Sequence, residues 1–203
     1  MPWPADVIDH LAGLDAHRDL SALRMRRVQA REQAQKSFLA LFDPEEVGGA
    51  SKLERFAIAA FVAGLHRESV ATEFYRSLLY ATAPDIVVVV KREIDRGQAR
   101  GPYGAFPAGP LSREDAPGPI FSVSDAGRAQ LGVRLTIALA HAHFLVFHPR
   151  DASPVHLQAL LDAGWSTTGV VTLSQLVAFL SFQLRVIVGL RQLAATPARQ
   201  AAA

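Results

Sequence analysis

The sequence predicts an all-α protein that folds as a single domain over residues 1–203. Half of the chain is hydrophobic, which is enough to bury a sizeable core. Apolar residues recur at helical spacing along most of the chain, and serines stand where several helices are expected to begin. The one segment with a strand signal has no evident partner strand, so no sheet is expected.

Residues 1–50 are expected to form N-terminal helices. Residues 20–41 are rich in strong helix formers and space apolar side chains among charges, which predicts one helix. Pro44 and the glycine pair at 48–49 then break the helical pattern. A helix and a break therefore precede the next segment.

Residues 51–97 are expected to form further helices. Ser51 is followed three residues later by Glu54, the pattern of a capping box, which predicts a helix over 51–63. A second helix follows Gly64, a plausible C-terminal stop. In residues 84–97 a run of valines favours a strand, whereas an initial proline and a charged tail favour the helix that we expect.

Residues 98–123 are predicted to be a proline- and glycine-rich loop. Five prolines and four glycines between residues 101 and 120 exclude regular structure there. In a compact domain, a loop of this length is usually functional or a crossover.

Residues 124–194 are predicted to form the C-terminal helices. Ser124 precedes a helix that runs to about Phe147, and Ser166 precedes the last long helix. A short helix between them starts at Ser153-Pro154 and ends at Gly164, while the tail, 195–203, is expected to be frayed.

The composition excludes several classes of function. A net charge of +2, from 21 basic and 19 acidic residues, provides no basic block for nucleic acid. No secretory signal is evident, and the apolar runs are shorter than the ~20 residues of a membrane span or are interrupted by polar residues. The absence of cysteine excludes disulfides and thiol chemistry by this chain alone. A cytoplasmic location follows by elimination.

Residues 138–190 resemble the C-terminal part of the carboxymuconolactone decarboxylase and AhpD-like superfamily. The shared pattern is an Ala/Leu helix, a proline, a short helix that ends in Leu-x-x-Ala-Gly, a capping serine, and a last helix with an aromatic pair before an arginine. The corresponding features are Pro149, 160–164, Ser166, Phe179 with Phe182, and Arg185.

The 51–97 region resembles a degenerate form of the core motif of that superfamily. In redox-active members, a helical glutamate precedes a Cys-x-x-Cys-x-x-x-His motif by twelve residues. At those offsets from Glu54 this chain has His66, Ser69 and Glu73. The resemblance implies an AhpD-like helical bundle and a homo-oligomer. Thiol peroxidase activity is expected to be absent, and some members work without a cysteine pair or a cofactor, so no cofactor is expected.

Glu54 and His66 could form a proton-transfer pair if the chain reverses at Gly64. His66 would then begin a second helix packed against the first, with Ser69 and Glu73 on the same face. A helix N-terminus would keep its imidazole neutral, and an opposing carboxylate would favour imidazolium. This interpretation predicts a cysteine-independent acid/base enzyme that acts on a small organic substrate, such as a lactone or an enolisable acid. The alternative is a solvent-facing helix start and a glutamate that only caps.

Two other residues of the matched region have alternative roles. Arg185 lies among apolar neighbours, so a carboxylate or backbone carbonyl groups are expected close to it, in a structural ion pair or, alternatively, at a site that binds a substrate anion. Trp165 follows the Ala-Gly stop and is expected to pack against the turn.

The histidines after residue 138 do not predict a metal site. His141 and His143 are two apart and point to opposite sides of a helix, and His148 lies five residues beyond His143. Satisfied or partly exposed histidines are expected, with His156 at the surface. Histidine-bound metal or haem is a weaker hypothesis, which an absorption spectrum tests.

A second function remains open, in which the chain is a non-catalytic family member that forms oligomers or binds a partner protein. It rests on apolar residues of the last helix, which are expected in the core or in a subunit interface. These residues are Val171, Leu176, Phe179, Phe182 and Val186.

Overall fold

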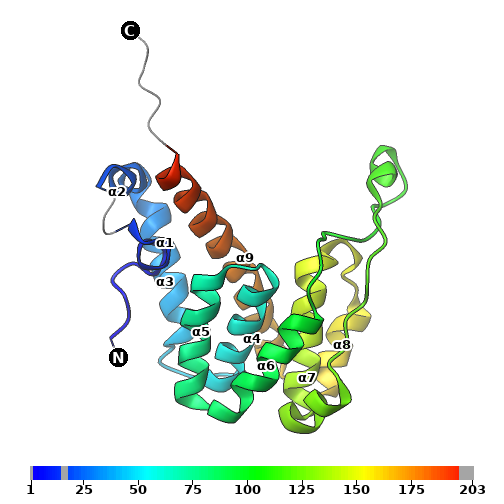
Figure 1. Ribbon diagram of the computed structural model, residues 1–203. Coiled ribbons are helices and arrows are strands. Elements are labelled where there is room, and N and C mark those ends of the chain that lie inside the picture. Colours follow the sequence, from blue (N-terminus) through cyan, green and yellow to red (C-terminus); the bar gives the residue numbers. More distant parts are fainter. Residues whose placement is uncertain (1, 15–17, 197–203) are drawn as a thin grey trace.

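A computed structural model describes residues 2–14 and 18–196, and this part of the chain is all-α, as predicted (Figure 1). The helices in chain order are α1 (Val7–Ala12), α2 (Arg18–Met25), α3 (Val28–Phe42), α4 (Lys52–Leu65), α5 (Ser69–Thr82), α6 (Pro84–Arg96), α7 (Asp125–Phe147), α8 (Pro154–Asp162) and α9 (Thr167–Ala195). The described residues also include the short 3-10 helices η2 (Pro110–Glu114) and η3 (Pro149–Asp151).

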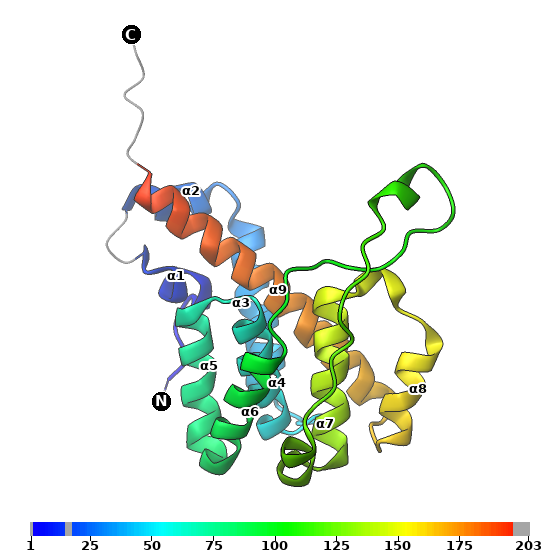
Figure 2. The same ribbon diagram turned by 45° about the vertical axis from the view of Figure 1, so that its right-hand side comes forward.

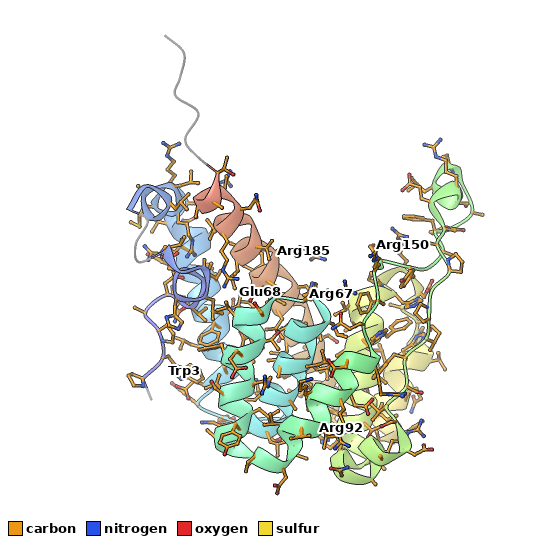
Figure 3. All side chains as sticks on the ribbon, viewed as in Figure 1. Trp3, Arg67, Glu68, Arg92, Arg150 and Arg185 are labelled. Carbon is orange, nitrogen blue, oxygen red and sulfur yellow. The ribbon has the colours of Figure 1, made fainter. Side chains whose placement is uncertain are left out.

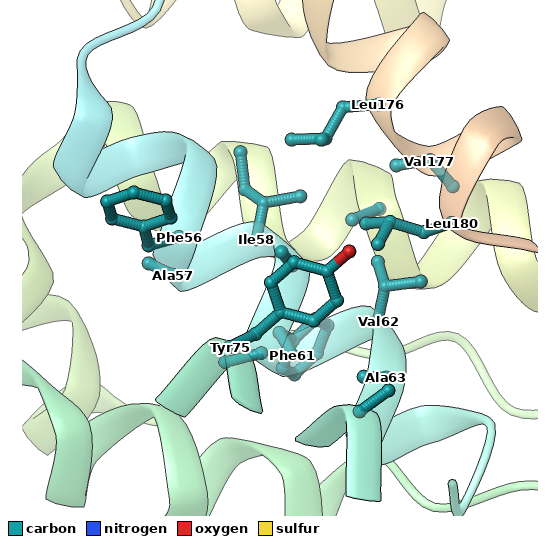
Figure 4. Close-up of a cluster of buried hydrophobic side chains, with 14 of the residues drawn as sticks. Phe56, Ala57, Ile58, Phe61, Val62, Ala63, Tyr75, Leu176, Val177 and Leu180 are labelled. Carbon is teal, nitrogen blue, oxygen red and sulfur yellow. The ribbon is translucent and has the colours of Figure 1, made fainter. Parts of the chain in front are cut away.

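Helix α4 is the centre of the fold. It packs against α5, α6, α7 and α9, and every residue from Arg55 to Leu65 is buried. Apolar side chains of α4, α5 and α9 meet in one cluster (Figure 4). In this cluster the Tyr75 hydroxyl donates to Oε1 of the fully buried Gln183 at 2.7 Å, so α5 and α9 are also joined by a polar contact. A helix that is apolar on all sides forms here because other helices cover all sides of it.

The helix predicted over residues 20–41 is two helices. The chain turns at Arg26 and Arg27, between α2 and α3, and both helices contact α9. Arg24 of α2 and Arg31 of α3 each bind the carboxylates of Asp6 and Asp9 beside and within α1. Tertiary contacts therefore divide a segment whose helix propensity is continuous.

Serine caps position three of the helices, as predicted. The side chains of Ser51, Ser124 and Ser166 each accept a hydrogen bond from the backbone N–H three residues later. Residues 84–96 form α6, with Pro84 at the first position, so the helical interpretation of the valine-rich segment is confirmed. Helix α9 extends to Ala195, and most of the predicted frayed tail lies outside the described residues.

The predicted loop projects from the helices as an arm (Figures 1 and 2). Its two limbs form a backbone bridge between Gly104 and Ala116, and the Phe106 N–H donates to Asp115. The 3-10 helix η2 is at its outer end, so the prediction that this segment contains no regular structure is wrong at these places. The guanidinium of Arg150 lies over the ring of Phe106, 4.1 Å from its centroid, which ties the arm to η3. The arm begins beside the cleft described below.

Helices α7 and α9 are long and apolar enough to cross a membrane by length and composition alone. They are longer than the apolar runs counted in the sequence, because each continues through polar residues. Helix α7 is not the uninterrupted helix that was predicted, since the backbone at Gly132 is not helical and kinks it. In each, 44% of the most apolar window is buried within the fold. Core helices of soluble proteins pass the same test, and the cytoplasmic location stays a prediction.

Candidate functional site

Glu54 is a fully bonded structural residue at the start of α4. Its Oε2 accepts from the Ser51 backbone N–H at 2.7 Å and from the Ser51 hydroxyl at 2.9 Å, which completes the capping box. Its Oε1 accepts from Nε of Arg134 at 2.6 Å, an ion pair that joins α4 to α7. Arg134 also donates to the backbone oxygens of Gly49 and Gly164. With 8% exposure and these partners, the carboxylate is committed to packing.

Glu54 and His66 do not meet, so the predicted proton-transfer pair is wrong. Helix α4 does not end at Gly64 but runs to Leu65, and His66 is its C-cap. Twelve residues at ~1.5 Å each place the two side chains about 18 Å apart along the helix axis. A Cβ at Gly64 would lie 2.6 Å from Cγ2 of Ile94, so this glycine permits the close approach of α6 and does not stop the helix.

Ser69 and Glu73 occupy exposed positions of α5, whereas His66 is the C-cap of α4. His66 precedes a left-handed Arg67 and the N-cap Glu68, so it is not part of α5 and the expected common face does not form. Glu73 pairs with Arg76 at 2.8 Å on the surface. Neither Ser69 nor Glu73 lines the cleft described next.

His66 and Arg185 do come together, in an open cleft of about 840 Å³. The end of α4, the first residues of the arm, the end of α7 and the middle of α9 form its walls. We call this the cationic cleft. Its lining residues are Leu65, His66, Arg67, 99–102, 145–147, Pro149, Ser174, Val177, Ala178, Ser181 and Arg185. Figure 3 shows Arg67 and Arg185 on the same open side of the molecule.

His66 is a half-buried imidazole with a lowered pKa. Burial disfavours its charged form, and the positive charge of Arg185 acts in the same direction, so the pKa of His66 lies below its ordinary value of 6.5. The C-terminal end of a helix favours a cation, yet burial and Arg185 outweigh it. The ring is therefore neutral near pH 7, with Nε2 3.4 Å from the Ser181 hydroxyl oxygen.

Arg185 is not the buried ion-pair residue that its apolar neighbours suggested. Its side chain is exposed, and its Nη1 donates to the Ser181 carbonyl at 3.3 Å. Together with Arg67 and Arg100 it supplies three guanidinium groups to the cleft. Within the described part of the chain, no aspartate or glutamate lines the cleft, so its electrostatic potential favours an anion.

Ser181, Arg67 and Arg100 line the cleft but were not predicted as site residues from the sequence. Ser181 stands four residues before Arg185, the spacing that puts two side chains on one helix face, and this signal was present in the sequence. Arg67 and Arg100 enter the cleft from a turn and a loop, whose positions depend on packing.

The other singled-out residues have clear places. Trp165 is buried, as expected, and its Nε1 donates to the Arg134 carbonyl at 3.0 Å. Nε2 of His143 lies 3.0 Å from the Gly97 oxygen. His156, expected at the surface, is half-buried and stacks on Phe144. Among the residues with described positions, no three His, Asp or Glu side chains are grouped as metal ligands.

No family model, curated protein or solved structure matches this chain.

Proposed function

We propose that the cationic cleft binds a small organic anion and that His66 exchanges a proton with it. The observation that carries the proposal is the neutral imidazole of His66 beside Ser181 and Arg185, in a cleft with three arginines and no acidic side chain among its described walls. The volume of about 840 Å³ falls in the range of small-molecule sites.

The substrate class follows from the lining. The guanidinium groups of the cleft can bind a carboxylate in bidentate fashion. The lining residues from α4, α7 and α9 also include aliphatic and aromatic side chains, which suit a carbon skeleton. A carboxylate with a short carbon skeleton, such as an enolisable acid or the acid of an opened lactone, satisfies both features.

His66 has the properties of a general base for such a substrate. It would take a proton from the carbon beside a carbonyl group, leave the electron pair on the resulting enolate, and return the proton to the product carbon. Arg185 would stabilise the enolate oxygen, and Ser181 would orient the imidazole. The bound carboxylate would offset the charge of Arg185 and thereby raise the pKa of His66 towards neutrality.

The family proposal is consistent with this chemistry. The motif match over residues 138–190 and the frame of Glu54, His66, Ser69 and Glu73 support a place among cysteine-free relatives of carboxymuconolactone decarboxylase and AhpD. In this proposal His66 is the acid/base group among these four motif positions, while Glu54 has a structural role.

The pKa of His66 provides the test. Ring ¹⁵N NMR of the full chain, titrated with and without malonate, should give a pKa below 6.5 in the free protein and a higher value with the probe bound. The Arg185→Gln variant should weaken malonate binding and reduce the rise. An unchanged His66 pKa at saturating malonate would contradict the proposal.

A peroxidase assay separates this chemistry from that of thiol-dependent relatives. Because the chain contains no cysteine, turnover of an alkyl hydroperoxide with a dithiol reductant should not exceed the rate in buffer. A rate above buffer that persists in pure protein would show another peroxidatic group.

A non-catalytic, oligomeric role is the alternative, and exposed apolar surface on α9 favours it. Leu176 is buried in the core, but Phe182 is 47% exposed and Val171 is 51% exposed. Phe182 also lines two grooves beside α3. Sedimentation velocity should show self-association that Phe182→Asp abolishes and Val133→Asp, which changes another exposed apolar residue, does not. A monomeric wild-type protein would exclude this role for α9.

A further inference from the structure

A second pocket, partly open to solvent at Ile120 and Ala159, lies between α7, α8 and the returning limb of the arm, and we call it the histidine pocket. It has a volume of about 180 Å³, and its walls are mainly apolar atoms. Its lining residues are Ile120, Phe121, Ile137, Ala140, His141, His143, Phe144, His148, His156 and Ala159. It shares no lining residue with the cationic cleft, so an inference about it is independent of the function proposed above.

Three of its four histidines have partners within the fold. His143 bonds the Gly97 carbonyl, and both nitrogens of His148 lie 3.0 Å from oxygens, one of Asp151 and one of Pro119. Nδ1 of His156 lies 2.9 Å from the Ser153 hydroxyl. These three rings are thereby held in place as walls of the pocket.

His141 differs from the other three. Its side chain is 6% exposed, and its buried Nε2 has no hydrogen-bond partner among the residues with described positions. A buried nitrogen without a partner destabilises the folded state, so such an atom in a native protein calls for an explanation.

The shape and chemistry of the walls specify a ligand. Cavities of about 150 Å³ with apolar walls accept one benzene ring, and this pocket is slightly larger. The rings of Phe121 and Phe144 provide aromatic surface, and Phe144 is itself stacked on His156 with centroids 4.0 Å apart. No Lys, Arg, Asp or Glu lines the described walls, which favours an uncharged molecule.

A hydroxyl group suits His141 in either neutral form of its ring. Burial lowers the pKa of His141 to about 4, so the ring is neutral at pH 7 and its Nε2 is an acceptor or a donor according to the tautomer. A hydroxyl both donates and accepts, and it therefore pairs with either tautomer. We propose that the histidine pocket binds an uncharged, single-ring aromatic compound whose hydroxyl group hydrogen-bonds His141.

The test compares two probes that differ by one hydroxyl group. Binding of 4-fluorophenol and fluorobenzene to the full chain is followed by ¹⁹F NMR at pH 7.5. We expect 4-fluorophenol to bind about tenfold more tightly, which corresponds to about 1.4 kcal/mol for one hydrogen bond. The ¹⁵N signal of His141 Nε2 should shift on addition of 4-fluorophenol.

Variants locate the binding and attribute the preference. His141→Leu should bind both probes with equal affinity, and Ala159→Phe, which fills the pocket from α8, should bind neither. His66→Leu in the cationic cleft is the matched control and should bind both probes as the wild type does. If His141→Leu does not fold, the loss of binding in Ala159→Phe and the shift of the His141 Nε2 signal still test whether the probe binds in the histidine pocket.

Four outcomes would overturn the proposal. They are equal affinity of the wild type for the two probes, a preference for 4-fluorophenol that survives in His141→Leu, binding that His66→Leu abolishes, and absence of binding at millimolar probe concentration. The third would assign the probes to the cationic cleft.

Discussion

The two ends of helix α4 have opposite characters. At its start, Glu54 is buried with each oxygen bonded, by Ser51 and by Arg134. At its end, His66 is half-buried, with one long contact to Ser181, and faces an open cationic cleft. One end is closed by its partners and the other is available to a ligand. The comparison shows that two polar residues twelve positions apart can differ in this way, because one is bonded within the fold while the other lines an open cleft.

The largest expected effect comes from breaking the closed end. Arg134→Leu leaves the Glu54 carboxylate without its ion-pair partner and removes the bonds to Gly49 and Gly164. The free energy of unfolding should fall by about 3 kcal/mol, as measured by urea denaturation. Lys52→Leu, which alters an exposed cation on the same turn, is the control. A loss below 1 kcal/mol in Arg134→Leu would show that this end is not closed by the ion pair.

A smaller loss of stability is expected from Ser51→Ala. This substitution removes the hydroxyl that accepts from the Glu54 N–H and donates to its carboxylate. The cost should be about 1–2 kcal/mol, because one cap is lost while Arg134 remains. Thermal unfolding of this variant is compared with that of Ser77→Ala, which alters an exposed position of α5 and should change the stability little. Equal effects of the two substitutions would contradict a special role for the cap.

At the open end, Arg185→Gln should change binding without changing stability. Loss of one exposed guanidinium should weaken malonate binding about tenfold, as measured by calorimetry at low salt. The free energy of unfolding should stay within about 0.5 kcal/mol of the wild type. Arg92→Gln removes the same charge at an exposed position of α6, outside the cleft, and should leave the affinity for malonate unchanged. If both variants weaken binding equally, net charge rather than the cleft explains the affinity.

The pH dependence of anion binding should depend on His66. Its pKa is below 6.5 in the free protein, and the bound anion raises it. Protonation then accompanies binding, so affinity is constant at high pH, rises as the pH falls through the pKa of the complex, and levels off below the pKa of the free protein. His66→Asn should remove this rise at pH 5–7.5. Persistence of the rise in the variant would assign it to another group.

The smallest effects are expected at the two motif residues on α5. Ser69→Ala and Glu73→Gln alter exposed side chains that do not line the cleft. Both variants should match the wild type in malonate affinity, and their free energies of unfolding should lie within about 0.5 kcal/mol of it. A clear loss of affinity in either would require α5 to reach the bound anion.

The sequence by itself determined the all-α class and most helix boundaries. Serine caps, Pro84 and apolar periodicity act within one or two helical turns, so local sequence is sufficient to specify them. The capping box of Ser51 and Glu54 is of this kind, and so is the position of the proline- and glycine-rich arm, although the sequence did not predict the 3-10 helix η2 within it.

Only the tertiary structure decided the composition of the sites. Gly64 is a residue type that often ends helices, but here it lies inside α4, where the absence of a side chain leaves room for Ile94. Because α4 continues past Gly64, His66 lies at the opposite end of the helix from Glu54. Arg134 reaches Glu54 across 80 positions of sequence. The histidine pocket likewise joins side chains of two helices and a loop. Such contacts depend on how whole helices pack, and helical periodicity within one segment does not specify the neighbours of that segment.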